Sequence, residues 1–201
     1  MSRWTVALAG SLTLQACIPH LESQVSDLTS GDWVRPENTW GSLADPGPPP
    51  ALTGQGYGEG DIVPDLRLPD QHGDLVSLWQ FYGSTIVLDV STMWCVPCQH
   101  LGEVTQATQD EYADEGLVYI TILQQDLYTQ PPTAEDIDLW VSGYEITSSP
   151  VLADAEEPPA SADAILVGFP AVFIVDAEMR VVERVDPPDH ATLTAAIEAA
   201  L

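Results

Sequence analysis

The chain contains no lysine, and its five basic residues are arginines, against 31 aspartates and glutamates in 201 residues. The formal net charge is therefore −26 at pH 7. A protein that binds nucleic acid or anionic lipid through its charge needs a basic surface, and this composition argues against one. It predicts instead a strongly solvated acidic surface, and no nucleic acid is expected as a partner.

Cysteine is also scarce, because the chain has only Cys17, Cys95 and Cys98. Attachment of c-type haem requires a histidine directly after the second cysteine of a Cys-x-x-Cys pair, and Gln99 stands there. A structural zinc site requires four ligands, and nearby only His100 could add to the pair. No metal or other cofactor is therefore expected, although a copper(I) carrier that uses both thiols and a distant histidine stays open.

Two of the cysteines belong to the segment Trp94-Cys95-Val96-Pro97-Cys98, which follows an apolar, β-branched run from Thr85 to Val90. This run predicts a buried strand, followed by a turn into a helix that begins near Cys95. Two thiols three positions apart can close a small disulfide ring, and the helix N-terminus favours a thiolate on the first of them. The pattern indicates redox chemistry. A structural disulfide is the alternative, but so small a ring restricts the unfolded chain little.

This strand, turn and helix resemble the active-site region of the thioredoxin superfamily, in particular the TlpA-like, redoxin-type thiol-disulfide oxidoreductases of the bacterial envelope. Asp89 lies six residues before Cys95, where thioredoxins carry a buried acid. Gly168-Phe169-Pro170 precedes a second apolar run, Ala171 to Asp176. The resemblance covers residues 61–201. It implies a thioredoxin-like three-layer α/β/α sandwich with a mixed central sheet, an added N-terminal hairpin and a cis bond before Pro170.

The resemblance also implies roles for the site residues. Cys95 would attack a partner disulfide, Cys98 would resolve the mixed disulfide, and Asp89, beneath the pair, would take the proton from Cys98. The alternative for Asp89 is an acid at a strand edge that faces solvent. Substrate contacts are expected from Trp94, Val96, Pro97, Phe169 and Pro170. The expected partners are disulfide-containing proteins and a membrane electron donor that reduces the pair again.

Two departures from the thioredoxin pattern bear on the reaction. The predicted strand Leu117 to Leu123 has no lysine near Asp89, where thioredoxins often place one. Thr92-Met-Trp-Cys95 matches part of the peroxidatic loop of peroxiredoxins, so a thiol peroxidase of the same fold is the main alternative enzyme. Against it, Leu88 stands where such loops carry a proline, and no arginine lies nearby in the sequence.

The N-terminal segment predicts export and lipid anchoring. Arg3 precedes the apolar stretch Trp4 to Leu14, which is too short to span a bilayer but fits a secretory signal. Leu14-Gln15-Ala16-Cys17 resembles the lipobox of bacterial lipoproteins. We therefore expect a signal peptide over residues 1–16 and a lipid anchor on Cys17. This places the protein in the bacterial cell envelope, facing the periplasm, with the outer membrane favoured.

Residues 17–60 predict a tether between this anchor and the domain at 61–201. Between residues 18 and 60 lie six prolines, which stiffen a chain, and seven glycines, which prevent regular packing. Trp33 and Trp40 are unusual in a linker and are expected to pack on the domain.

Within the domain, apolar patterns and turn residues predict strands alternating with helices, before a terminal hairpin and helix. Strands are expected at 66–68, 75–78, 85–90, 117–123, 151–153, 171–175 and 180–185, and helices at 95–115, from 133 onward and at 190–201. This order favours an α/β fold over an all-β fold or a helical bundle.

Overall fold

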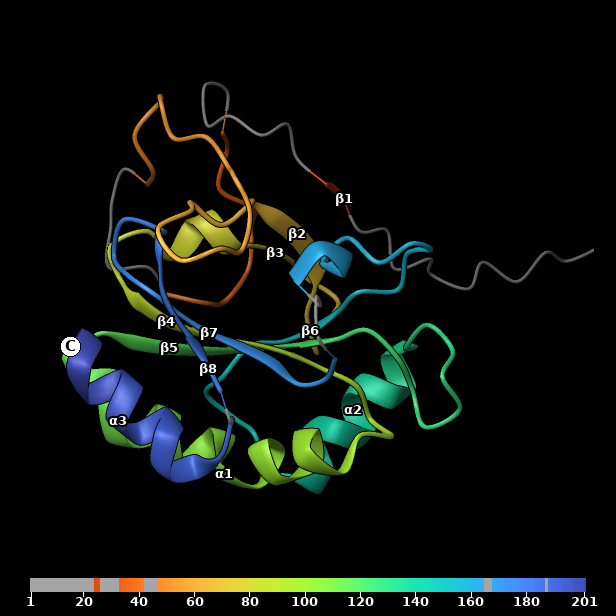
Figure 1. Ribbon diagram of the computed structural model, residues 1–201. Helices are drawn as coiled ribbons and strands as arrows, with labels where there is room; N and C mark the ends of the chain where they lie inside the picture. Colours follow the sequence, from red (N-terminus) through yellow and green to blue (C-terminus); the bar gives the residue numbers. More distant parts are fainter. Residues whose placement is uncertain (1–23, 26–32, 42–46, 165–167, 187) are drawn as a thin grey trace, which may run out of the picture.

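A five-stranded mixed sheet, in the order β6-β5-β4-β7-β8, forms the centre of the computed structural model, which describes residues 24–25, 33–41, 47–164, 168–186 and 188–201 (Figure 1). Its strands are β4 (Thr85–Ser91), β5 (Leu117–Leu123), β6 (Val151–Ala153), β7 (Ala171–Val175) and β8 (Val181–Val185). β4 pairs in parallel with β5 and antiparallel with β7. The predicted α/β class and mixed central sheet are confirmed.

Three α-helices follow the strands at the predicted places: α1 (Val96–Tyr112), α2 (Ala134–Gly143) and α3 (His190–Ala200). A 3-10 turn, η2 (Ala113–Glu115), extends α1, and Gly116 ends it with a left-handed φ of 93°. A residue with a side chain adopts this φ at a cost, so glycine is the usual residue at such a helix end. The predicted limit of this helix is therefore confirmed.

An N-terminal sheet packs against the central one. β1 (Gln24–Val25) pairs with β2 (Leu66–Pro69), and β2 forms the predicted hairpin with β3 (Leu75–Ser77). The 3-10 helix η1 (Leu78–Phe81) follows directly, and another, η3 (Ala162–Ala164), lies between β6 and β7. None of the helices in the described ranges is long and apolar enough to cross a membrane.

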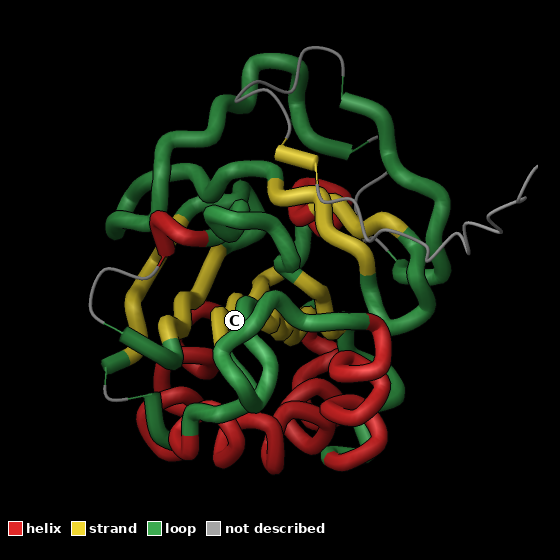
Figure 2. Tube along the Cα trace, turned by 90° about the vertical axis from the view of Figure 1, so that its right-hand side faces the viewer, coloured by secondary structure: helices red, strands yellow, loops and turns green. Residues whose placement is uncertain are grey.

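The two faces of the central sheet are covered by layers of different kinds. Figure 2 shows the α-helices gathered on one side of the central sheet, with the N-terminal hairpin on the other. The hairpin side is closed by large side chains of η1, among them Trp79 and Phe81, both buried. The added hairpin and η1 thus form the layer on the second apolar face of the sheet.

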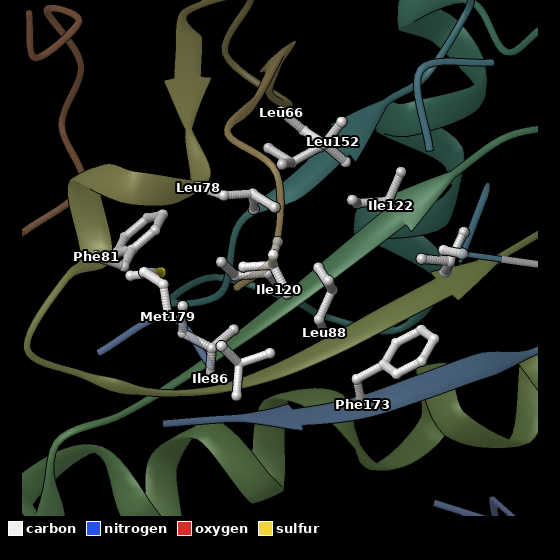
Figure 3. Close-up of a cluster of buried hydrophobic side chains, with 14 of the residues drawn as sticks. Leu66, Leu78, Phe81, Ile86, Leu88, Ile120, Ile122, Leu152, Phe173 and Met179 are labelled. Atoms are coloured by element: carbon white, nitrogen blue, oxygen red, sulfur yellow. The ribbon is translucent and has the colours of Figure 1, made fainter. Parts of the chain in front are cut away.

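The alternation of side chains along β4 divides the interior into two parts, because successive residues of a strand face opposite sides. Ile86 and Leu88 point toward the hairpin and pack with Ile120 and Phe173 (Figure 3). Val87 points toward the helices and belongs to a second cluster with residues of α1 and α3. Asp89 and Ser91 share the side of Val87, and this places a carboxyl and a hydroxyl beneath α1.

The described segments 33–41 and 47–60 lie on the domain. Trp33 donates from Nε1 to Ser77 Oγ at 3.0 Å, and Trp40 donates from Nε1 to Asp70 Oδ2 at 2.5 Å. The prediction that these two tryptophans pack on the domain is confirmed. These described parts of the predicted tether therefore lie along the domain. The predicted signal peptide and Cys17 lie outside the described residues.

Candidate active site

The two cysteines lie where β4 passes into α1 at the carboxyl end of the strand. Cys95 is the N-cap of α1, and Cys98 lies within its first turn. Both are free thiols. Cys95 is less exposed than the sequence predicts, at 5%, because it packs in an apolar cluster with Phe169 and Trp140. Cys98 has no exposed surface, so Cys95 is the thiol that solvent can reach.

A buried polar chain connects Cys98 to Asp89. The Ser91 hydroxyl donates to Asp89 Oδ1 at 2.5 Å and is also hydrogen bonded to the Cys98 side chain. Asp89, Ser91 and Cys98 are all fully buried. The structure thus confirms the interpretation of Asp89 as a buried acid and contradicts the alternative of a solvent-facing one.

Burial changes the acidity of this chain of groups. It raises the pKa of Asp89 to about 7, although the hydrogen bonds from Ser91 and Tyr119 oppose the shift. The pKa of the Cys98 thiol is raised as well, first by burial, then by its hydrogen bond to Cys95, and also by the negative charge of Asp89. At neutral pH, Cys98 therefore holds its proton beside an acid that is half ionised.

Tyr119 on β5 is a second partner of Asp89 that the sequence reasoning missed. Its hydroxyl donates to Asp89 Oδ2 at 3.3 Å and is also hydrogen bonded to Thr105 on α1. This strand has no lysine near Asp89, and the neutral Tyr119 hydroxyl donates to the acid instead. Ser91 could have been found, since it follows Asp89 by two positions in a strand. Tyr119 could not, because its contact depends on the register that pairs Val87 with Tyr119.

The predicted substrate-contacting residues surround Cys95. Trp94, Val96 and Pro97 are exposed, and Phe169 and Pro170 are half-buried. The rings of Trp94 and Phe169 meet edge to face with centroids 6.0 Å apart, and the Phe169–Pro170 peptide bond is cis. The structure therefore brings the two predicted segments together beside Cys95, and it adds Gln125, whose Oε1 accepts from Trp94 Nε1 at 2.8 Å.

The active-site turn has one unsatisfied group. The Thr92 hydroxyl is buried without a hydrogen-bond partner, and the Cys95 amide donates to the Thr92 carbonyl at 3.4 Å.

No arginine or metal-ligand cluster lies at this site within the described residues. The four arginines that the structure describes make their contacts away from the site, with Trp40, Asp65, Gly60 and Phe173. Across the described ranges, no three histidine, cysteine or acidic side chains are grouped as metal ligands.

The fold and this site together define a thioredoxin-like protein with a thiol-disulfide redox centre. The model of the AhpC/TSA family matches residues 60–184, which is more than half of the chain. The chain belongs to this family.

A curated relative is the thioredoxin-like protein YneN of Bacillus subtilis, which is 25% identical over 121 residues, 60% of this chain and 67% of that protein. Two solved structures share the fold. The thioredoxin domain of thiol-disulfide oxidoreductase BVU-2223 from Bacteroides vulgatus is 20% identical with a TM-score of 0.59, and the match covers 71% of this chain and 96% of that one. A thiol:disulfide interchange protein from Chlorobium tepidum is 19% identical with a TM-score of 0.57, over 71% and 97%. The predicted thioredoxin-like fold is confirmed.

Proposed function

We propose that this protein reduces or exchanges disulfides in substrate proteins outside the cytoplasm, through the Cys95–Cys98 pair. The observation that carries the proposal is the buried connection from Cys98 through Ser91 to Asp89, behind a first cysteine that solvent can reach. Such an arrangement serves the second step of disulfide exchange, in which the resolving thiol must lose a proton. A structural disulfide has no use for a proton acceptor with a pKa of about 7.

The first step is attack by the Cys95 thiolate on a sulfur of the substrate disulfide. A mixed disulfide forms between Cys95 and the substrate, and the second substrate sulfur leaves as a thiolate. The position of Cys95 at the N-cap of α1 supports this role, because the partial positive charge of a helix N-terminus favours a nearby anion.

The second step is resolution by Cys98. Ser91 passes its proton to ionised Asp89 and takes the proton of Cys98, whose thiolate then attacks Cys95 Sγ. The Cys95–Cys98 disulfide forms, and the remaining substrate sulfur leaves. The two thiols of the protein have lost two electrons, and the substrate disulfide has become two thiols. A dithiol donor must then reduce the pair again, and we propose that this donor is a membrane electron carrier.

The compartment is part of the proposal. The segment that precedes the described domain carries a secretory pattern and a lipobox ending at Cys17. This supports a protein held on the periplasmic side of a bacterial envelope membrane by lipid, with its disulfide-containing substrates in the same compartment.

The proposal is tested with paired cysteine variants. Cys98→Ser should still make the first attack but fail to resolve it, so covalent complexes with substrate proteins accumulate on non-reducing gels. The matched variant Cys95→Ser should trap no partner and should not reduce insulin. Equal trapping by both variants, or insulin reduction by Cys95→Ser, would contradict the assigned roles.

A second candidate, thiol peroxidase, is favoured by the family match and by the unsatisfied Thr92 hydroxyl beside Cys95. In that reaction the Cys95 thiolate would take one oxygen from a hydroperoxide, releasing water or alcohol, and the resulting sulfenic acid would condense with Cys98 to a disulfide and water. Stopped-flow rates of the reduced protein with hydrogen peroxide and with a peptide disulfide distinguish the two. Faster oxidation by peroxide at equal concentration would favour the peroxidase.

A further inference from the structure

Exposed apolar side chains gather at the active-site end of the protein. Of the eight large hydrophobic side chains exposed in the described part of the chain, two flank Cys95, namely Trp94 at 42% and Val96 at 57%. Two more lie in the connection between β5 and α2, namely Leu127 at 48% and Tyr128 at 81%. Figure 1 shows this connection projecting at the end of the sheet where β4 passes into α1. Exposed apolar groups that cluster in this way mark interaction surfaces more often than isolated ones do.

The connection is a tight turn with a fixed shape. Asp126 Oδ1 accepts from the amides of Tyr128 and Gln130 at 2.7 and 2.8 Å. The Asp126 amide donates to the Gln130 carbonyl at 2.8 Å, and Thr129 has a left-handed φ of 64°. These bonds hold the backbone while they leave Leu127 and Tyr128 in solvent. A surface that is already ordered loses little entropy when a partner binds.

The turn is also attached to the active site. The Met93 amide donates to the Gln125 carbonyl at 3.0 Å, and Trp94 donates to the side chain of the same residue. Gln125 directly precedes the turn, so these two bonds fix the position of the turn relative to Trp94, the neighbour of Cys95.

The charge around this surface has one sign. Glu135, Asp136 and Asp138 lie in the first half of α2, just after the turn, and no lysine or arginine lies between Arg67 and Arg180. A partner that places an apolar side chain on the turn therefore meets carboxylates next to it. A basic partner gains from this field, and an acidic one is repelled.

We propose that Leu127 and Tyr128 determine substrate specificity, by docking a polypeptide segment that carries an apolar residue and a lysine or arginine near its disulfide. The inference rests on the proposed function, because the segment must present its disulfide to Cys95. It deepens that function by naming the chemistry of the preferred substrate, which complements both the apolar turn and the acidic start of α2.

The test uses synthetic peptides closed by one disulfide, with leucine and lysine beside it, and 2-hydroxyethyl disulfide as a neutral small substrate. In Leu127→Ser and Tyr128→Ser, kcat/KM for the peptide should fall by about tenfold, as for a residue that contributes substantially to an interface. The rate with 2-hydroxyethyl disulfide should not change, since this molecule is too small to reach the turn. The control is Val182→Ser on β8, whose parent residue is 47% exposed, closely matching Leu127.

A second measurement tests the charge. Replacing lysine by aspartate in the peptide should lower kcat/KM, and added salt should slow the lysine peptide and speed the aspartate peptide. Equal peptide kinetics in wild type and both turn variants, or no difference between the two peptides, would overturn the inference while leaving the proposed function intact. Failure of the wild-type protein to reduce either substrate would instead contradict the proposed function.

Discussion

The residue that connects structure to reaction most directly is Asp89, a fully buried acid on the central strand β4. In the proposed reaction, Asp89 accepts a proton from Cys98 only when it is ionised. Because its pKa is about 7, roughly half of the molecules carry the ionised form at neutral pH. Ser91 lies between the two and can carry the proton without any movement of the backbone.

The rate of resolution should therefore depend on pH. In the wild-type protein, conversion of a preformed mixed disulfide to the Cys95–Cys98 disulfide should accelerate as pH rises through about 7, because Asp89 ionises there. Asp89→Asn should be slower by roughly 10²-fold and lack this pH dependence, as expected when a general base is removed. Rapid quenching with acid and mass spectrometry measure the step.

Ser91→Ala should slow the resolution step while leaving the first attack by Cys95 unchanged. An unaltered resolution rate in this variant would remove Ser91 from the proton path.

The same residue should make stability depend on pH. Between pH 3.8 and about 7, folded Asp89 holds a proton that the unfolded chain releases. The free energy of unfolding therefore falls as pH rises through this window, by on the order of 4 kcal/mol at 1.36 kcal/mol per unit of pKa. Urea unfolding of the reduced protein at pH 5 and pH 8 measures the part of this fall that lies above pH 5, about 3 kcal/mol. It should be smaller in Asp89→Asn by that amount, and parallel behaviour of the two proteins would contradict the buried, raised acid.

At the scale of elements, α2 supports the apolar side of the site. Its residues Ile137 and Trp140 pack in the cluster that contains Cys95 and Cys98. The helix begins with a reciprocal cap, in which the Thr133 side chain accepts from the Asp136 amide and the Thr133 amide donates to the Asp136 carboxylate. This cap secures the helix start that packs beside the active-site cysteines.

Removal of this cap should lower stability. Thr133→Ala is expected to reduce the free energy of unfolding by about 1 kcal/mol, the usual cost of losing an N-cap side chain. Chemical denaturation measures it, with Thr53→Ala as the control at an exposed threonine outside the helices. A loss of the same size in both variants would show that the cap contributes nothing specific.

The elements also show what the sequence could and could not predict. The strands and helices follow from local apolar periodicity, and the end of α1 follows from Gly116, so both were predictable. The covering of the second sheet face was not, because it depends on how η1, which follows the hairpin, packs Trp79 and Phe81 over Ile86 and Leu88. At the site, Cys95 and Cys98 follow from their spacing and Asp89 from the family resemblance, whereas Tyr119 and Gln125 approach through pairing between strands and loops far apart in the sequence.

At the scale of the whole molecule, the domain extends beyond the boundary predicted at residue 61. Tyr57 contacts Phe173 with ring centroids 5.6 Å apart, and Leu52 packs against the same core. The Gly60 amide donates to the Val181 carbonyl at 2.8 Å, which joins this segment to β8.

Truncation tests this boundary. A chain that begins at residue 61 should unfold at a lower denaturant concentration than one that begins at residue 47, with a loss on the order of 2 kcal/mol from the uncovered apolar surface. Both chains lack residues 1–46 and keep the active site, so they differ only in residues 47–60. Equal midpoints would mean that residues 47–60 add no stability and would restore the predicted boundary.

The burial of the catalytic chain has a further consequence for the order of events in one turnover. Asp89, Ser91 and Cys98 have no exposed surface, and Cys95 alone among these four groups reaches solvent. In the proposed reaction, the proton that Asp89 gains therefore leaves along the route by which the substrate arrives and departs. In that reaction, a polypeptide that covers Cys95 closes this exit, and Asp89 stays protonated and uncharged. Departure of the product then reopens the exit, so release of the reduced substrate also lets Asp89 lose its proton before the cysteine pair is reduced again.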